Sequence, residues 1–421
     1  MTDKKETKIF YGWLLLISAW LLTACSTGMF INSMTQFQKP VCEAMNITRG
    51  QFSLSTSFIS LAVMALSPFV GSIFEKFKPK RVVTLGGILM LIGWLGFSFV
   101  PNIQLFYVMA ILIGIGSSVA GAVVVNIILN NWFHAKKGFA MGFASTGSGF
   151  GSMVFNPLGS VLILHFGYQT AFRGLWICAL LCILPILILF VYKPEEKGLL
   201  PYGDEKKASN EESTKADLAA VQTEGYTRTQ ALHTPAFWGV CFISFGLSAG
   251  AIGIFSQMAS YLTDIGHSPA LAATLVSLIS LSMAVSKIFF GWLNDKLGTY
   301  RNFLIIAAIG IFGIFSLFTA KNVVCAYVSA VLFGISFSAT NVMAPLITVY
   351  AMGSKDFANI FGLVSFAIYI GPIVASPFSA TIYDLNGSYN LAFLCYGILY
   401  IAVFLVGLVI LKKGFAEKMN S

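Results

Sequence analysis

The sequence contains few charged residues: 26 Lys and Arg and 17 Asp and Glu make up 10% of its 421 residues. Soluble domains carry roughly 25% charged residues. This chain is instead 57% hydrophobic, with 38 Phe and a mean hydropathy of +0.81. These values exclude an ordinary soluble domain and indicate a protein that crosses a membrane several times.

The sequence also lacks the motifs of metal sites and of common enzyme active sites. The seven cysteines form no Cys-x-x-Cys pair and no Cys/His cluster with metal-ligand spacing. Most of them fall inside apolar runs, where cysteine packs as a small hydrophobe. A phosphate loop and a nucleophile constellation are also missing, so we expect no enzyme, no metal and no cofactor. The net charge of +9 does not indicate nucleic acid binding, because the positive residues gather in short loops.

Twelve apolar runs, most of them long enough for the roughly 20 residues that one crossing needs, follow one another along the chain. They span residues 10–36, 52–74, 82–100, 104–131, 138–165, 172–192, 236–262, 269–293, 302–320, 323–350, 357–382 and 390–411. Six runs lie on each side of a polar stretch rich in Glu, Lys, Ser and Ala. We therefore expect a six-helix bundle over 1–192, a cytoplasmic linker over 193–234 and a second bundle over 235–421.

The positive residues lie mainly on alternate loops. They are Lys4, Lys5 and Lys8, then Lys76, Lys78, Lys80 and Arg81, Lys136 and Lys137, Lys296 and Arg301, Lys355, and finally Lys412, Lys413 and Lys418. Because Lys and Arg accumulate on the cytoplasmic side, both termini are predicted to be cytoplasmic in a multi-pass protein of the cell (inner) membrane. The first run lacks a small-residue cleavage site, so no signal peptide is expected.

Two pairs of segments repeat along the chain. Residues 71–81 follow the second run and residues 291–301 follow the eighth, and the segment at 167–172 has a counterpart at 387–393. Both pairs share the same offset, so the halves are parallel repeats related by an axis along the membrane normal. The prediction is an all-α membrane protein of twelve transmembrane helices in two pseudo-symmetric six-helix bundles.

The repeated loops resemble the major facilitator signature Gly-x-x-x-Asp-Arg/Lys-x-Gly-x-x-Arg, which implies the major facilitator fold. The second copy fits the signature, whereas the first has Glu75 for Asp, Lys76 for Arg and Lys78 for Gly. An acid at a helix end beside basic loop residues can latch neighbouring helices, although a plain positive-inside loop would explain the charges alone. The candidate cytoplasmic gate comprises Gly71, Glu75, Arg81, Gly291, Asp295 and Arg301.

A more specific resemblance lies in residues 131–151, which are similar to the fifth-helix pattern of monocarboxylate and oxalate/formate transporters. Its glycines recur at four-residue spacing, as Gly138 and Gly142 and as Gly147 and Gly151. Small residues at this spacing let helix backbones approach closely, so a packing role is expected for them. The segments 10–13, 231–238 and 371–393 resemble the same transporters, so the resemblance touches both halves.

The resemblance implies a secondary active transporter that moves a small monocarboxylate by alternating access, with a proton, and a substrate site between the bundles. An anion exchanger, a proton-driven exporter of drugs or other organic solutes, and a membrane sensor remain alternatives. The expected partners are the carboxylate, protons and the lipid bilayer, and the protein is expected to be monomeric.

Lys287 is the candidate substrate cation, because an ammonium deep in an apolar run is costly and is seldom kept without a function. In the transporters that the chain resembles, a basic residue of the eighth helix pairs with the substrate carboxylate. Helical spacing places Ser277, Ser280, Ala284 and Gly291 on the same face as Lys287. The second cation of oxalate carriers is replaced here by Ile368, which favours a monocarboxylate. The alternative is a lysine that extends to the cytoplasm.

The proton-coupling candidates are Lys287 itself and Asp264. Asp264 could equally well be an exposed loop acid without a role in proton coupling. Further polar side chains of the apolar runs are candidates for lining the substrate site, although each could instead form a helix–helix hydrogen bond. They are Asn32, Asn126, Gln257, Asn341 and Tyr369.

Overall fold

The structure, a computed structural model, describes residues 10–47, 49–204 and 225–419, and within these ranges it contains helices and two isolated β-bridges but no strand. The N-terminal half is formed by α1 (Tyr11–Thr23), a π-helix (Ala24–Met29), a 3₁₀ helix (Asn32–Phe37), α2 (Gln38–Met45), α3 (Arg49–Leu66), a 3₁₀ turn (Ser67–Phe69), α4 (Val70–Lys76), α5 (Pro79–Gly96), α6 (Ile103–Ala120), α7 (Ala122–Trp132) and α8 (Lys137–Leu189).

A 3₁₀ turn (Pro194–Lys197) and α11 (Arg228–Leu232) belong to the segment predicted as a linker, whose residues 205–224 lie outside the described residues. The C-terminal half follows with α12 (Pro235–Phe255), α13 (Met258–Asp264), α14 (Pro269–Leu297), α15 (Thr299–Ser316), a 3₁₀ turn (Leu317–Thr319), α16 (Val323–Met352), α17 (Phe357–Asn386) and α18 (Asn390–Met419).

Ten helical segments of the described chain are long and apolar enough to cross a membrane. The 53-residue α8 accounts for two predicted runs, because Gly167 interrupts it with φ 78° and ψ 166°. The third run corresponds to α5, whose 18 residues include Lys80 and Arg81 near its start. The elements thus accommodate the twelve predicted crossings. Several runs are broken helices: Gly121 separates α6 from α7, and Gln257 lies between α12 and α13.

The start of α14 shows how the local sequence sets a helix boundary. Ser268 adopts an extended backbone, and its side-chain oxygen accepts a hydrogen bond from the backbone N–H of Leu271. Pro269 occupies the first helical position, where its missing N–H costs nothing. Thr234 and Pro235 begin α12 in the same way. These caps satisfy otherwise orphaned backbone donors in an apolar chain, where each unsatisfied group is costly.

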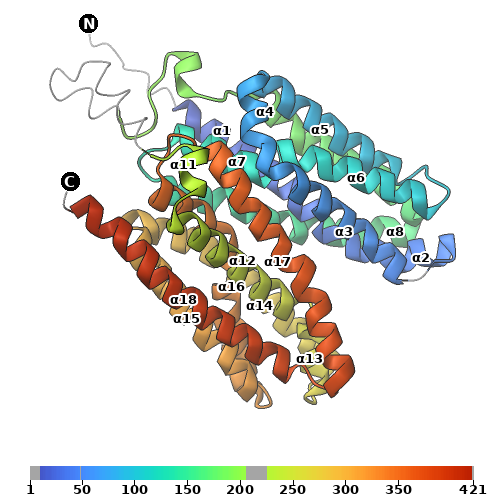
Figure 1. Cartoon of the computed structure of the whole chain (residues 1–421). Coiled ribbons are helices and arrows are strands. Elements are labelled where there is room, and N and C mark those ends of the chain that lie inside the picture. The colour runs from blue at the N-terminus through green and yellow to red at the C-terminus, as the bar shows by residue number, and fades with distance from the viewer. Residues whose placement is uncertain (1–9, 48, 205–224, 420–421) are drawn as a thin grey trace, which may run out of the picture.

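The two halves meet at the end of the molecule where α1 begins and α18 ends, which we call the terminal face. Figure 1 shows the two halves close together there and diverging toward α2 and α13 at the far ends. The halves are joined mainly where α8 packs along α14 and where α17 packs on α3, α4 and the turn between them. The structure therefore describes a conformation in which the halves are joined at the terminal face.

Candidate functional site

Lys287 lies in the middle of α14, and its side chain is buried between α14 and α8 with only 1% of its surface exposed. Its ammonium Nζ donates to the hydroxyl Oγ of Ser148 over 3.0 Å and to the backbone carbonyl of Ser145 over 3.2 Å. Both acceptors belong to α8, in the other half. Within the described chain no carboxylate lies at ion-pair distance from Lys287. A cation from one half is therefore held by uncharged acceptors of the other.

Glycine allows this approach of the two helices. A Cβ on Gly142 would overlap the backbone carbonyl of Lys287, and a Cβ on Gly291 would overlap that of Gly138. The second glycine pair of α8 serves another contact, since Cβ atoms on Gly147 and Gly151 would overlap the backbone at Trp20 and Ala24. Gly138 and Gly142 thus allow α8 to pack closely on α14 of the other half. Gly147 and Gly151 allow α8 to pack closely on the first helical segments of its own half.

At the terminal face, Asp295 contacts the first turn of α8. Its Oδ1 accepts from the backbone N–H of Gly138 over 2.7 Å, and its Oδ2 accepts from that of Phe139 over 2.8 Å. The first N–H groups of a helix have no intrahelical partner, and the helix dipole favours a negative charge at this end. One carboxylate of α14 therefore caps a helix of the opposite half. Arg301, assigned to the same gate, is exposed and forms no ion pair with it in the described chain.

The first copy of the signature makes its cross-half contact through an amide instead. Glu75 accepts a hydrogen bond from Nδ2 of Asn359, in the first turn of α17, over 2.5 Å. The same amide donates to Asp356 over 2.7 Å, and a Cβ on Gly71 would overlap Asn359. Arg81 is exposed and pairs with no acid of the described chain. Asn359 was not identified from the sequence, because no motif marks a lone asparagine near a helix start.

The remaining candidates are distributed over both halves. Asn32 is exposed and donates through Nδ2 to Oγ of Ser152 over 2.9 Å. Asn126 is buried, Gln257 and Tyr369 are half-buried, and Asn341 and Asp264 are exposed. Lys287 bonds to none of these six, since its described partners are Ser145 and Ser148. Among these six, hydrogen bonds of the described residues connect Asn32 to Lys287 through Ser152 and Ser148 of α8. Ser145 and Ser148 lie within the segment 131–151 and Ser152 follows it directly, but the sequence alone gave these serines no role at the site.

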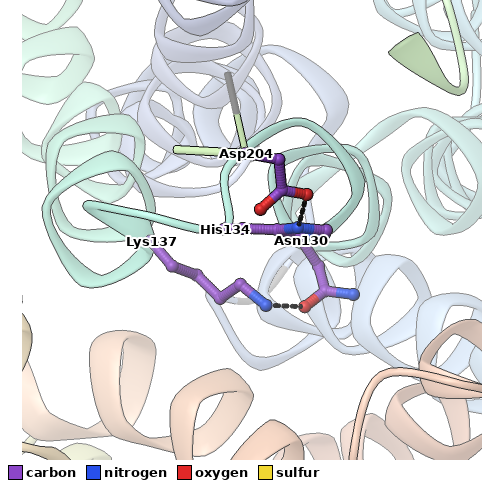
Figure 2. Close-up of polar contacts among 4 residues, drawn as sticks. All are labelled: Asn130, His134, Lys137 and Asp204. Carbon is purple, nitrogen blue, oxygen red and sulfur yellow. Dashed lines mark hydrogen bonds and ion pairs between the residues drawn. The ribbon is translucent and has the colours of Figure 1, made fainter. Parts of the chain in front are cut away.

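A cavity of about 670 Å³ opens at the terminal face, lined by residues of both halves that include Glu75, His134, Lys137 and Asp356. Figure 2 shows two contacts at its edge: His134 Nδ1 lies 2.7 Å from Asp204 Oδ2, and Lys137 Nζ donates to Asn130 Oδ1 over 2.7 Å. Burial lowers the pKa of His134, although the Asp204 carboxylate opposes this effect. The pair ties the chain after α8 to the loop that precedes α8.

The same loop is fixed by Tyr202. Its carbonyl accepts from the backbone N–H groups of His134 and Ala135, and its own N–H donates to the carbonyl of Trp132 over 2.9 Å. The ring of Tyr202 packs against Phe10, Trp13 and Phe133. Because this loop leads directly into the first turn of α8, residues 202–204 help to hold the backbone donors that Asp295 caps.

Replacing Asp295 by alanine is expected to weaken the joining of the halves at the terminal face. The variant loses two charge-assisted hydrogen bonds, each worth about 1.5–3 kcal/mol, and a favourable charge at the α8 dipole. Spin labels at Leu85 and Trp238, exposed positions near the starts of α5 and α12, should report a larger population at long distance. Glu75→Gln is the matched control, because glutamine retains an acceptor for Asn359. Identical distance distributions for Asp295→Ala and the unmutated protein would contradict the capping role.

Comparison with known proteins agrees with this architecture. The family model of the Major Facilitator Superfamily matches residues 12–357 and 241–420. The chain is 25% identical over 406 residues to Monocarboxylate transporter 12-B of Danio rerio, covering 92% of this chain and 84% of the relative. It is also 25% identical over 298 residues to the Oxalate:formate antiporter of Oxalobacter formigenes, covering 70% and 66%.

Two solved structures share the fold. The proton:xylose symporter XylE matches with a TM-score of 0.75 and 14% identity, covering 94% of each chain. The transporter FucP, solved in the outward conformation, matches with a TM-score of 0.72 and 16% identity, covering 95% of this chain and 98% of that one. The predicted twelve-helix fold and the predicted resemblance to monocarboxylate and oxalate/formate transporters are confirmed. The chain is a multi-pass membrane protein, a transporter rather than an enzyme by its family, and it belongs to the Major Facilitator Superfamily.

Proposed function

We propose that this protein is a secondary active transporter that moves a small monocarboxylate across the cell (inner) membrane by alternating access, together with a proton. The relatives named for monocarboxylate and for oxalate and formate transport support an organic anion as substrate. The proposal includes a bundle over 1–192, a linker over 193–234, a bundle over 235–421 and cytoplasmic termini. With that orientation, the terminal face is the cytoplasmic side, and this conformation is closed to the cytoplasm.

The observation that carries the proposal is the burial of the Lys287 ammonium against uncharged acceptors. A lysine ammonium has three donors, and two of them reach uncharged oxygens of Ser145 and Ser148. Hydrogen bonds between two ionised groups are stronger than those to neutral acceptors. A buried ammonium without a carboxylate partner is therefore suited to bind an anionic ligand. One cation matches one carboxylate, which favours a monocarboxylate over a dicarboxylate such as oxalate.

Symport with one proton would make the transported charge zero. This avoids about 2.3 kcal/mol per elementary charge for each 100 mV of membrane potential. Of the two proton-coupling candidates, Asp264 is exposed at the end of α13, whereas Lys287 is buried between the halves. Burial between the halves favours Lys287 as the group that changes charge, because its access to water would change when α8 and α14 separate, whereas Asp264 is already exposed in this conformation. We propose that Lys287 serves both the substrate and the proton.

Uptake into proteoliposomes tests the proposal. A panel of labelled acids should include formate, lactate, pyruvate, oxalate and a bulky amphipathic carboxylate, each with and without an inward proton gradient. The expected result is saturable uptake of at least one monocarboxylate, faster with the gradient and unaffected by a membrane potential. Uptake that is indifferent to pH but accelerated by internal anion would instead favour exchange. Failure of every acid, with uptake of a neutral or cationic solute, would contradict the proposal.

A further inference from the structure

We propose that Ser148 and Ser152 of α8 are substrate-positioning residues that lead a carboxylate from exposed Asn32 to buried Lys287. The inference rests on the proposed function and names residues that the sequence did not assign to the site. The four side chains come from three elements: the 3₁₀ helix after α1, α8, and α14 of the opposite half.

The hydrogen bonds of these side chains follow one face of α8, partly through its backbone carbonyls. Asn32 donates to Ser152 Oγ over 2.9 Å, and that hydroxyl donates to the carbonyl of Ser148 over 2.9 Å. The hydroxyl of Ser148 donates to the carbonyl of Ser145 over 2.9 Å and accepts from Lys287 over 3.0 Å. Residues three and four apart lie on one helix face, so the serines make a ladder of polar groups along α8. We call Ser145, Ser148 and Ser152 the serine ladder.

Exposure falls along this ladder. Asn32 is exposed, the three serines are half-buried, and Lys287 is 1% exposed. In this conformation the hydroxyls of Ser152, Ser148 and Ser145 donate to backbone carbonyls of α8. An anion that enters by Asn32 could draw the hydroxyls of Ser152 and Ser148 away from these carbonyls, because a hydroxyl rotates to suit its acceptor. An apolar face of α8 would not compensate for the loss of water around a carboxylate, since burying an unpaired charge is costly.

Ser148 has the chemistry to exchange partners. A hydroxyl is both donor and acceptor, and in this conformation Ser148 uses both capacities, one on Ser145 and one on Lys287. A substrate carboxylate is a stronger acceptor than a hydroxyl for the ammonium. On arrival it can take the place of Ser148 Oγ at Lys287, and the freed hydroxyl can rotate to donate to the carboxylate. Ser148 thus holds Lys287 in place without substrate and binds the substrate afterwards.

The exchange also joins the two halves through the ligand, because Lys287 belongs to the C-terminal half and the serine ladder to the N-terminal half. The bond between Ser148 and Lys287 cannot persist when α8 and α14 separate. The carboxylate, bound to Lys287, would then retain a partner for the ammonium. This gives substrate occupancy a direct effect on the reopening of the interface.

Ser148→Ala tests the role of the hydroxyl, with Ser148→Thr as the conservative rescue and Ser160→Ala as the matched control. Ser160 lies on the same helix, and its hydroxyl donates to Gln36 instead. We expect Ser148→Ala to raise the KM for the carboxylate about tenfold, the loss of one hydrogen bond to a charged group. Ser148→Thr should restore the KM to within about twofold, and Ser160→Ala should leave it unchanged.

A second readout does not depend on transport: reductive methylation of the Lys287 amine, followed by peptide mass spectrometry on protein of unchanged melting temperature. Lys287 should react slowly in the unmutated protein and in Ser160→Ala, and several-fold faster in Ser148→Ala. Unchanged KM and unchanged methylation in Ser148→Ala would overturn the inference while leaving the proposed function standing. If no carboxylate is transported, the proposed function is wrong, and so is the exchange of Ser148 for a carboxylate at Lys287. Faster methylation of Lys287 in Ser148→Ala would still establish that Ser148 holds Lys287 in place.

Discussion

Lys287→Met is expected to raise the KM for carboxylate uptake strongly while the protein still folds and inserts. Methionine has a similar length and no charge, so it fills the space between α14 and α8 without the cost of a buried ammonium. Removing one partner of a buried, hydrogen-bonded charge pair costs about 2–5 kcal/mol. At about 1.4 kcal/mol for each factor of ten, the KM should rise by about 30-fold or more. Initial uptake rates over a range of concentrations measure it.

Lys296→Met is the matched control. Lys296 lies on the same helix, but it is exposed, and its ammonium lies 4.1 Å from the centre of the Trp292 ring. Its loss removes the same charge from α14 without touching the interface with α8. Equal losses of uptake in the two variants would show that the net charge of the helix matters rather than the position of Lys287. Full uptake by Lys287→Met would refute the substrate role.

Lys287→Arg separates substrate binding from proton movement. Arginine binds carboxylates with two parallel hydrogen bonds, but it remains protonated at any physiological pH. If Lys287 carries the proton, this variant should still exchange internal for external carboxylate and should no longer accumulate it under an inward proton gradient. Accumulation that persists at the unmutated level would assign the proton to another group and leave the binding role intact.

The sequence predicts two halves and singles out Lys287, because both inferences depend on patterns along the chain. Repeated loops at one offset predict two equivalent bundles. A cation inside an apolar run stands out because placing a charge in the bilayer costs several kcal/mol, so it is seldom kept without a function. The breaks inside runs were not predicted: Gly121 divides one run, and Ala24–Met29 forms a π-helix within another. Apolar composition predicts that a segment crosses the bilayer, but it does not predict where the helix breaks or changes to a π-helix.

The partners of the site residues could not be predicted for a different reason. Ser148 meets Lys287 only because α8 and α14, which lie far apart in sequence, approach backbone to backbone. Glu75 reaches α17 through the amide of Asn359, an isolated residue without a motif. The spacing of Gly138 and Gly142 did predict a close helix partner. Which helix it would be depends on how the two halves assemble, and the spacing alone does not contain that information.

Gly142→Ala is expected to abolish most transport by preventing the closed contact of α8 with α14. The added Cβ would overlap the backbone carbonyl of Lys287, and backbone on both sides leaves no flexible side chain to move aside. Overpacking of this kind costs about 1–3 kcal/mol, which shifts the equilibrium between conformations by about 5- to 150-fold. Alternating access needs both conformations, so uptake should fall by a similar factor. Spin labels at Leu85 and Trp238 should report the separated state.

Two other glycines of α8 make this prediction specific to the interface between the halves. A Cβ on Gly149 would lie 3.5 Å from that of Ala284 across the same interface, an ordinary contact, so Gly149→Ala should transport normally. A Cβ on Gly147 would overlap the backbone of Trp20 within the N-terminal half. Gly147→Ala should therefore lower the melting temperature without favouring the separated state. If Gly142→Ala and Gly149→Ala gave the same distance distribution, close packing at Gly142 would not control the conformational equilibrium, and the halves would have to be held together chiefly by the polar contacts of Asp295 and Glu75.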